Sequence, residues 1–427
     1  MSSIADRAAN LGPLAGLVVV DCSTVLAGPY CTMLLGDLGA DVIKVEPPDG
    51  DATRGWGPPW VGSEAAGTRT AAYYLAINRN KRSLRLDLKS PAGPGVLRRL
   101  LARGDVVVEN FRVGGFARLG FDDQALERLN PALVHLAISG YGSTGPAARL
   151  PGYDFVIQAA SGLMSITGAP DAEGGGPTKV GVAISDVVTG MLGAVGVLAA
   201  LIGREGGWPL PREDPRDAGP IRRGGQRIDI SLLGATLASL VNQAQNAFVS
   251  GVAPERLGNA HPNIVPYETF ETADSPIAVA IGSARQWPKF CHALGLPELA
   301  TDARFATNGD RVMARAVLRS ILDGRFRQRS AAEWLVTLDA ASIPCGPIND
   351  VVSAFASTEA AALDMVVEGS HPEWGVIRQV GIPFKLAATP ASIRLPPPAL
   401  GEQTDEVLRE LGYTLAEISE LHAAAVV

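Results

Sequence analysis

The 427-residue sequence lacks most of the short motifs that mark cofactor, metal or nucleic-acid sites. It has no Walker loop, no HExxH motif and no CxxC pair, and its five histidines lie far apart, so nothing in it indicates a metal site. Residues 17–29 lack the GxGxxG spacing that cradles a dinucleotide, which disfavours nicotinamide and flavin cofactors. The net charge is -7 and no basic stripe is present, which argues against a nucleic-acid partner.

Cysteine, signal-like segments and long apolar runs are also scarce. The four cysteines stand among apolar or small neighbours, as buried reduced thiols do, so we expect a reducing cytoplasm. The first ten residues have no basic start followed by an apolar stretch, so we expect no secretory signal. The longest apolar run, residues 187–203, is shorter than the roughly 20 residues of a membrane span. We interpret it as a buried helix and expect no membrane contact.

One carboxylate stands inside the most apolar part of the chain. Asp186 is the only charged residue in the segment 180–201. At the start of a helix, Ser185 or Asp186 could accept the free N–H groups of the first turn, and the helix dipole would keep Asp186 in place and ionised. The same junction would also present a reactive carboxylate at the mouth of a cleft, where the sites of α/β proteins collect. The two interpretations do not exclude each other.

The first 150 residues alternate short β-branched runs with amphipathic segments. This alternation predicts parallel strands joined by right-handed helical crossovers, and therefore an α/β protein with a doubly wound sheet. The predicted strands are residues 17–21, 41–46, 83–88, 105–109 and 133–139, and the predicted helices are residues 29–38, 95–103 and 122–129.

The rest of the chain is long enough for a second unit, since domains usually hold roughly 100 to 200 residues. Residues 203–226 are rich in proline, glycine and both charges, and are typical of a linker or flap. We predict strands at 227–231, 277–281, 365–368 and 376–380, helical segments at 232–250 and 401–422, a helix opened by Pro288, and a turn at 343–347.

Nine segments, in order along the chain, match a known pattern. On these segments the chain resembles the family III CoA-transferases (CaiB/BaiF family), which include formyl-CoA transferase and the carnitine and bile-acid CoA-transferases. They are residues 26–29 (LAGP), 35–46 (LGDLGADVIKVE), 80–83 (NKRS), 86–89 (LDLK), 108–111 (VENF), 152–154 (GYD), 185–186 (SD), 343–347 (IPCGP) and 401–408 (GEQTDEVL).

The resemblance implies a large Rossmann-like domain built from both chain ends, a smaller α+β middle domain, and two subunits that interlock as a homodimer. The corresponding segments are 1–202 for the N-terminal part of the large domain, 203–226 for the linker, 227–251 for a strand and connecting helix, 252–342 for the small domain and 343–427 for the return to the large domain. The linker would give each chain the slack to encircle its partner.

The resemblance also implies the chemistry. An acyl-CoA and a carboxylic acid would be the substrates, with coenzyme A bound only as a thioester and no permanent cofactor. The residue in the position of Asp186 attacks the thioester, giving an aspartyl anhydride and then an aspartyl-CoA thioester. Covalent catalysis suits this reaction because both intermediates stay activated, and burial near Ile184 and Val187 would exclude water.

Further site residues follow from the resemblance alone. Gly282 corresponds to a glycine-rich loop that closes over the site in relatives, although a plain turn fits it as well. Residues 162–168 are similar to those of relatives that act on succinyl-CoA and other dicarboxylates. The family's CoA contacts map to Val25, Leu26, Ala27, Leu86, Lys89, Asn110, Phe111 and Arg118, where the cations suit phosphates.

Three features bear on alternatives. An α-methylacyl-CoA racemase would need a histidine where this chain has Tyr153, and an unperturbed tyrosine is a poor base at neutral pH, so Tyr153 is assigned to substrate or CoA contact. Formyl-CoA transferase has an arginine where this chain has Pro47 and Pro48, so Arg54 or Arg82 would have to supply that phosphate contact. A catalytically silent CoA-binding protein is the third possibility, with Asp186 only a cap.

Overall fold

The computed structural model describes residues 12–206 and 224–427, and its chain forms two compact units. Unit 1 consists of Met1–Ser161, Gly181–Ala244 and Glu359–Val427, and unit 2 of Gly162–Val180 and Gln245–Thr358. Two differences from the predicted segments stand out. Residues 162–180 belong to unit 2, and unit 2 continues to Thr358 instead of ending at residue 342. Most of the predicted linker 203–226 lies outside the described residues.

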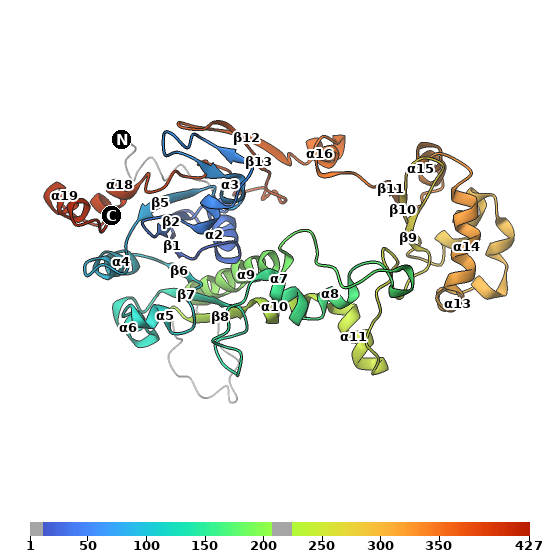
Figure 1. Ribbon diagram of the computed structural model, residues 1–427, viewed down its shortest axis with the longest axis horizontal. Helices are drawn as coiled ribbons and strands as arrows, with labels where there is room; N and C mark the ends of the chain where they lie inside the picture. Colours follow the sequence, from blue (N-terminus) through green and yellow to red (C-terminus); the bar gives the residue numbers. More distant parts are fainter. Residues whose placement is uncertain (1–11, 207–223) are drawn as a thin grey trace. The chain divides into compact units, whose positions relative to one another are not determined.

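Unit 1 contains a six-stranded parallel sheet (Figure 1). The strands lie in the order β5-β2-β1-β6-β7-β8. If the six strands of this sheet are numbered 1 to 6 along the chain, the order is 3-2-1-4-5-6. This is the order of a doubly wound Rossmann sheet, and it confirms the predicted α/β architecture. Its switch point lies between β1 and β6. Their bounds are β1 Val18–Cys22, β2 Asp41–Glu46, β5 Lys81–Arg85, β6 Val106–Glu109, β7 Val134–Ser139 and β8 Arg227–Ser231.

Helices cover both faces because successive strand residues point to opposite sides of the sheet. Val19 and Val106 belong to one buried cluster, and their neighbours Val20 and Val107 to the other. One face packs against α2 (Ala27–Asp37), α9 (Ile184–Gly206) and α10 (Leu232–Ser239). The other packs against α4 (Gly93–Leu101), α5 (Gly115–Arg118), α6 (Asp123–Leu129), α18 (Thr404–Glu410) and α19 (Leu415–Ala423).

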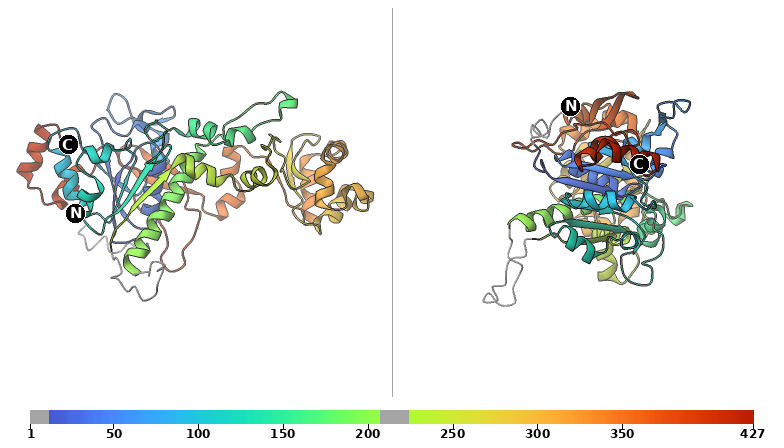
Figure 2. Two further views of the ribbon diagram at one scale, coloured as in Figure 1. Left: turned by 90° about the horizontal axis from the view of Figure 1, so that it is seen from below. Right: turned by 90° about the vertical axis from the view of Figure 1, so that its left-hand side faces the viewer.

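The apolar helix α9 packs on the sheet, as Figure 2 shows beside β7 and β8. It is longer than the sequence predicted, and residues 184–204 would satisfy the length and composition of a membrane span. Its buried residues Ala194, Val197 and Leu201 nevertheless lie in the core of unit 1. Glycine lets it approach α2 closely, because a Cβ at Gly190 would lie 2.6 Å from the carbonyl oxygen of Ala27.

Short elements complete unit 1. They are η1 (Ala52–Gly55), α3 (Ala72–Leu75), α7 (Asp154–Ala160), the antiparallel pair β3 (Trp60–Val61) and β4 (Thr70–Ala71), and the antiparallel pair β12 (Val366–His371) and β13 (Gly375–Val380).

Unit 2 is built on a three-stranded antiparallel sheet. The sheet has the order β11-β10-β9, and an aromatic core that includes Phe270, Phe326 and Trp334 packs between it and the helices. Its elements are α8 (Leu163–Ile166), η2 (Asp171–Glu173), β9 (Tyr267–Phe270), β10 (Ile277–Ala280), α12 (Gln286–Leu294), η3 (Pro297–Ala300), η4 (Ala303–Phe305), α13 (Asn308–Met313), α14 (Arg315–Phe326), α15 (Ala331–Ala340), β11 (Cys345–Pro347) and α16 (Val351–Phe355). Two helices run from one unit into the other, α11 (Val241–Ser250) and α17 (Thr358–Ala362).

Four local predictions were wrong. Residues 345–347 form β11 and pair with β10, so the predicted turn at 343–347 is partly a strand. Helix α12 begins before Pro288, which still falls among the first residues whose N–H groups need no partner within the helix. The helix predicted at 232–250 is interrupted between Ser239 and Val241, where Val241 has a φ of 34°, and that at 401–422 is interrupted at Gly412, whose φ is 85°.

Candidate active site

A cleft of about 260 Å³ opens at the carboxyl ends of the parallel strands in unit 1. Thr24, Val25 and Ala27 follow β1, and Asn110 and Phe111 follow β6. These two strands flank the switch point of the sheet, where loops diverge to opposite faces and leave room for a ligand. Further walls come from the segments after β7 and β8 and from the start of α9.

Asp186 lies in this cleft as the third residue of α9. It does not cap the helix: the N–H of Ser185 donates instead to Oδ1 of Asp154, at 2.8 Å. The backbone N–H of Ala27, the first residue of α2, acts on the Asp186 carboxyl group as a donor that lowers its pKa. The capping interpretation is therefore wrong, because another aspartate serves the first turn of α9 and leaves Asp186 facing the cleft.

The environment of Asp186 favours its protonated form. Burial and the nearby Asp154 raise the pKa of Asp186 from 3.8 to about 7, against the Ala27 hydrogen bond, which lowers it. The expectation that the helix start keeps this carboxylate ionised therefore does not hold below about pH 7. Removing a charge from water and placing a like charge beside it outweigh one backbone donor. A group that titrates near neutral pH inside a cleft is typical of a functional site.

Tyr73 of α3 also belongs to this electrostatic environment. Burial, followed by the negative charges of Asp186 and Asp154, raises the pKa of Tyr73 to about 12. Its ring packs edge-on against Trp56, with the ring centroids 5.3 Å apart. The phenol therefore keeps its proton at neutral pH and can act only as a neutral hydrogen-bonding group.

Six of the residues assigned from the sequence meet in the cleft. They are Val25, Ala27, Asn110, Phe111, Tyr153 and Asp186. Asn110 also holds the loop after β1, because its side-chain amide accepts from the N–H of Thr24 at 3.0 Å and donates to the carbonyl of Thr24 at 2.8 Å. Tyr153 is the residue before α7 and is 61% exposed, so its ring is accessible to a ligand.

The other assigned residues do not line the cleft. Leu26 and Leu86 are buried, and Leu86 lies in the core of unit 1. Lys89 and Arg118 are exposed outside it. Gly282 belongs to unit 2, where it follows β10 and a Cβ would meet no atom within 4 Å.

The positive charges that line the cleft were not found from the sequence. Arg112 and Arg149 both line it and are exposed. Within residues 12–206 and 224–427, no carboxylate pairs with either guanidinium. Of the two arginines considered as substitutes for a phosphate contact, Arg82 pairs with Asp41, Glu406 and Glu410, and Arg54 makes two hydrogen bonds to Glu46.

A search for metal ligands and a comparison with known protein families both bear on the chemistry. In the described part of the chain, no three His, Cys, Asp or Glu side chains gather in a way that could hold a metal ion. Among known proteins, the family model of CoA-transferase family III matches residues 14–404. The chain belongs to this family.

Individual proteins that the chain is similar to agree with this assignment. The chain is 42% identical to the succinate–glutarate CoA-transferase of Agrobacterium fabrum over 93% of this chain and 96% of the relative. It is 38% identical to the human succinyl-CoA:glutarate CoA-transferase over 98% of this chain and 90% of the relative. Its fold matches the crystal structure of a CAIB/BAIF family protein from Brucella suis with a TM-score of 0.79 and 40% identity, over 94% and 99% of the two chains. The protein is thus an enzyme of the CoA-transferase type.

Proposed function

We propose that this family III enzyme moves CoA from a succinyl-type thioester to a small dicarboxylic acid through covalent intermediates on Asp186. The observation that carries the proposal is the placement of Asp186 in the cleft, where Asp154 accepts the N–H of Ser185 and the N–H of Ala27 lowers the pKa of the Asp186 carboxyl group. The printed names of the similar enzymes, which pair succinyl or succinate with glutarate, support the dicarboxylate class.

In the first exchange, an oxygen of the Asp186 carboxylate attacks the carbonyl carbon of the acyl-CoA thioester. The C–S bond breaks, CoA leaves as the thiolate, and a mixed anhydride remains on Asp186. The thiolate then attacks the Asp186 carbonyl carbon, the anhydride C–O bond breaks, and the donor acid leaves as its carboxylate. The product is an aspartyl-CoA thioester. Because one thioester replaces another, the free energy of hydrolysis of the original thioester is conserved on the enzyme.

In the second exchange, the acceptor carboxylate attacks the aspartyl-CoA carbonyl carbon and expels the thiolate. The thiolate attacks the acceptor carbonyl of the new anhydride, forming the product thioester and restoring the Asp186 carboxylate. The Ala27 N–H can donate to the oxyanion each time the Asp186 carbonyl becomes tetrahedral. Arg112 and Arg149 supply positive charge for the anionic substrates.

Two alternatives make different predictions. A racemase would need a basic side chain where this chain has Tyr153. No histidine is among the described residues that line the cleft. A silent CoA-binding protein would not need a carboxylate whose pKa lies near 7 inside the cleft.

The test is to trap the intermediates with hydroxylamine or borohydride in the presence of succinyl-CoA, and to read the Asp186 peptide by mass spectrometry. We expect a mass change on that peptide and loss of transfer in Asp186→Asn. Asp364→Asn is the matched control, because this exposed aspartate pairs only with exposed Lys385 among its described ion pairs. An unlabelled peptide together with active Asp186→Asn would refute the mechanism.

The interlocked homodimer and the cytoplasmic location are also part of the proposal. Helix α9 exposes apolar side chains that a partner subunit would cover, among them Met191 at 49%, Val195 at 61% and Ile202 at 62%. The four cysteines are all free thiols, which suits a reducing compartment. Sedimentation at several protein concentrations tests the dimer, and fractionation of cells tests the location.

A further inference from the structure

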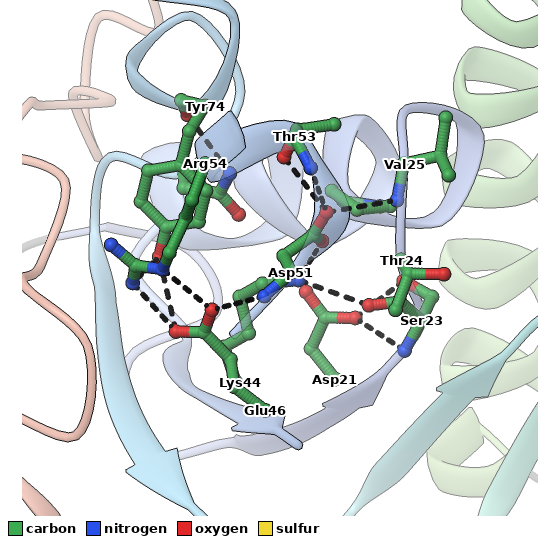
Figure 3. A network of polar contacts seen from close by, with 12 residues as sticks. Asp21, Ser23, Thr24, Val25, Lys44, Glu46, Asp51, Thr53, Arg54 and Tyr74 are labelled. Carbon is green, nitrogen blue, oxygen red and sulfur yellow. Dashed lines mark hydrogen bonds and ion pairs between the residues drawn. The ribbon is translucent and has the colours of Figure 1, made fainter. Parts of the chain in front are cut away.

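The loop between β1 and α2 carries the backbone that faces Asp186, and buried side chains hold it. Lys44 Nζ donates to the carbonyl of Ser23 at 2.9 Å, and Lys81 Nζ donates to the carbonyl of Pro29, in the first turn of α2 just after the loop, at 2.8 Å. Between these points, the N–H of Val25 donates to Oδ1 of Asp51 at 3.4 Å (Figure 3). The loop is thus fastened by charged groups on its inner side.

The conformation of this loop needs such support. Val25 has a φ of 71°, in the left-handed region that a β-branched residue rarely adopts. Conformations of this kind persist only where the surrounding structure enforces them, and they cluster at functional sites. Two residues later, Ala27 begins α2; it lines the cleft with Asp186, and its N–H lowers the pKa of that carboxyl group. The direction of that N–H therefore depends on how the Val25 turn is held.

Asp51 is itself held by several groups. Its Oδ1 also accepts from the N–H and the hydroxyl of Thr53, at 2.9 and 2.8 Å, and its Oδ2 pairs with Lys44 Nζ at 2.9 Å. The N–H of Asp51 donates to Glu46 at 3.0 Å, and Glu46 makes two hydrogen bonds to Arg54. Figure 3 shows these groups in one continuous network beside Ser23, Thr24 and Val25.

Stability alone does not account for this arrangement. The side chains of Lys44 and Asp51 are both 0% exposed, and a fully buried ion pair gains little net stability over apolar residues of similar size. What the pair adds is a fixed geometry, since each member fastens a different backbone atom of the same loop. The arrangement is suited to setting the position of the loop against a partner across the cleft.

We propose that Lys44 and Asp51 are positioning residues that hold the left-handed Val25 turn and thereby aim the Ala27 N–H at the reacting carboxyl group of Asp186. The proposal rests on the proposed role of Asp186 as nucleophile. It assigns to a buried charge pair the control of a backbone donor that acts on that carboxyl group.

The proposal predicts a change that general loosening of the fold would not produce. The Ala27 N–H lowers the pKa of Asp186, while burial and Asp154 on α7 raise it, and the charge of Asp186 in turn acts on Tyr73 of α3. If the turn moves and the donor is lost, ionised Asp186 becomes less favourable. The acid limb of the pH profile of kcat/KM then moves to higher pH, whereas a merely less stable enzyme loses activity without moving the limb.

The test variant is Asp51→Asn, which keeps size but leaves Lys44 without its charged partner. We expect kcat to fall by about tenfold or more, the KM for succinyl-CoA to change by less than about threefold, and the acid limb to rise by about half a pH unit or more. Thr53→Val is the matched control, since it removes one donor to the same oxygen and leaves the Val25 contact in place. It should keep the limb of the unmodified enzyme.

A second comparison separates positioning from folding. Glycine adopts a positive φ without strain, so in a Val25→Gly background the Asp51→Asn change should reduce kcat at least threefold less than in the native background. If Asp51→Asn is insoluble, Lys44→Gln breaks the same ion pair and should move the limb in the same direction.

An unmoved limb in the soluble pair-breaking variant, or equal losses with and without Val25→Gly, overturns the positioning role. Failure of the nucleophile assignment is recognised separately, because Asp186→Asn would then still transfer CoA.

Discussion

Asp186 should reduce the stability of the folded protein at neutral and alkaline pH, so Asp186→Asn should stabilise it there. The folded-state pKa of Asp186 is raised above its ordinary value, which means that the folded protein binds this proton more tightly than the unfolded chain. Between the two pKa values the unfolded chain carries fewer protons at this site, so stability falls as the pH rises from about 4 to about 7. Asparagine carries no such proton and escapes the loss.

The size of the effect follows from the pKa. A pKa raised from 3.8 to about 7 corresponds to about 4 kcal/mol, because each pH unit is worth about 1.4 kcal/mol. Asp186 keeps contact with solvent, which screens its charge, so we expect roughly half of that, about 2 kcal/mol, at pH 8. The difference between the two proteins should shrink to near zero at pH 4.

Urea denaturation of both proteins at pH 8, 6 and 4.5 measures this difference, at one protein concentration so that association does not vary. The variant should have the higher free energy of unfolding at pH 8, and the gap should close on acidification. Equal stabilities at pH 8, or a gap that does not depend on pH, would refute the reasoning that burial and Asp154 penalise the ionised nucleophile. The same variant should have lost CoA transfer, which would make the trade between stability and chemistry directly visible.

Three further predictions concern neighbouring groups. Asp154→Asn keeps an acceptor for the N–H of Ser185 but removes a negative charge beside Asp186. The acid limb of the pH profile of kcat/KM should therefore move to lower pH. A limb that stays in place or moves to higher pH would contradict this prediction. Arg149→Met should raise the KM of a dicarboxylic acceptor by about tenfold while changing that of a monocarboxylic acid little, in steady-state assays with both acids; equal effects would place Arg149 elsewhere in binding. Gly190→Ala should lower the free energy of unfolding by about 1–3 kcal/mol in urea denaturation, because its Cβ would lie 2.6 Å from the carbonyl oxygen of Ala27. Gly203→Ala in the same helix should not lower it, because a Cβ there meets no atom within 4 Å. Similar losses at both glycines would contradict the close contact of α9 with α2.

Much of unit 1 could be predicted because its signals are local. The β-branched runs at Val18–Cys22 and Val106–Glu109 are strands in the structure, and strand–helix alternation is enough to predict a parallel sheet. Asp186 could be singled out because a lone charge in an apolar segment is visible in one dimension. The family resemblance, carried by nine short segments, was likewise legible from the sequence and agrees with the family model.

The parts of the site that escaped prediction depend on distances across the fold. Asp154 lies 31 residues before Ser185, and only the packed structure shows that it caps α9. Lys44 and Lys81 stand in strands, and the sequence pattern does not show whether such a lysine is exposed or buried. Both are buried because each pairs with an aspartate outside its own strand, Lys44 with Asp51 and Lys81 with Asp21. Leu86 was assigned to the cleft, but it follows β5 and packs with Leu84 in the core of unit 1, which only the folded chain shows.

The cap on α9 has a consequence for the whole reaction cycle. During turnover Asp186 would pass from a carboxylate to an uncharged anhydride and then to a thioester carrying CoA. A helix that relied on this side chain for its first turn would lose its cap at each acylation. Because Asp154 accepts the N–H of Ser185, the first turn of α9 keeps this hydrogen bond whatever group is attached to Asp186. The scaffold that presents the nucleophile is thereby insulated from the chemistry that the nucleophile undergoes.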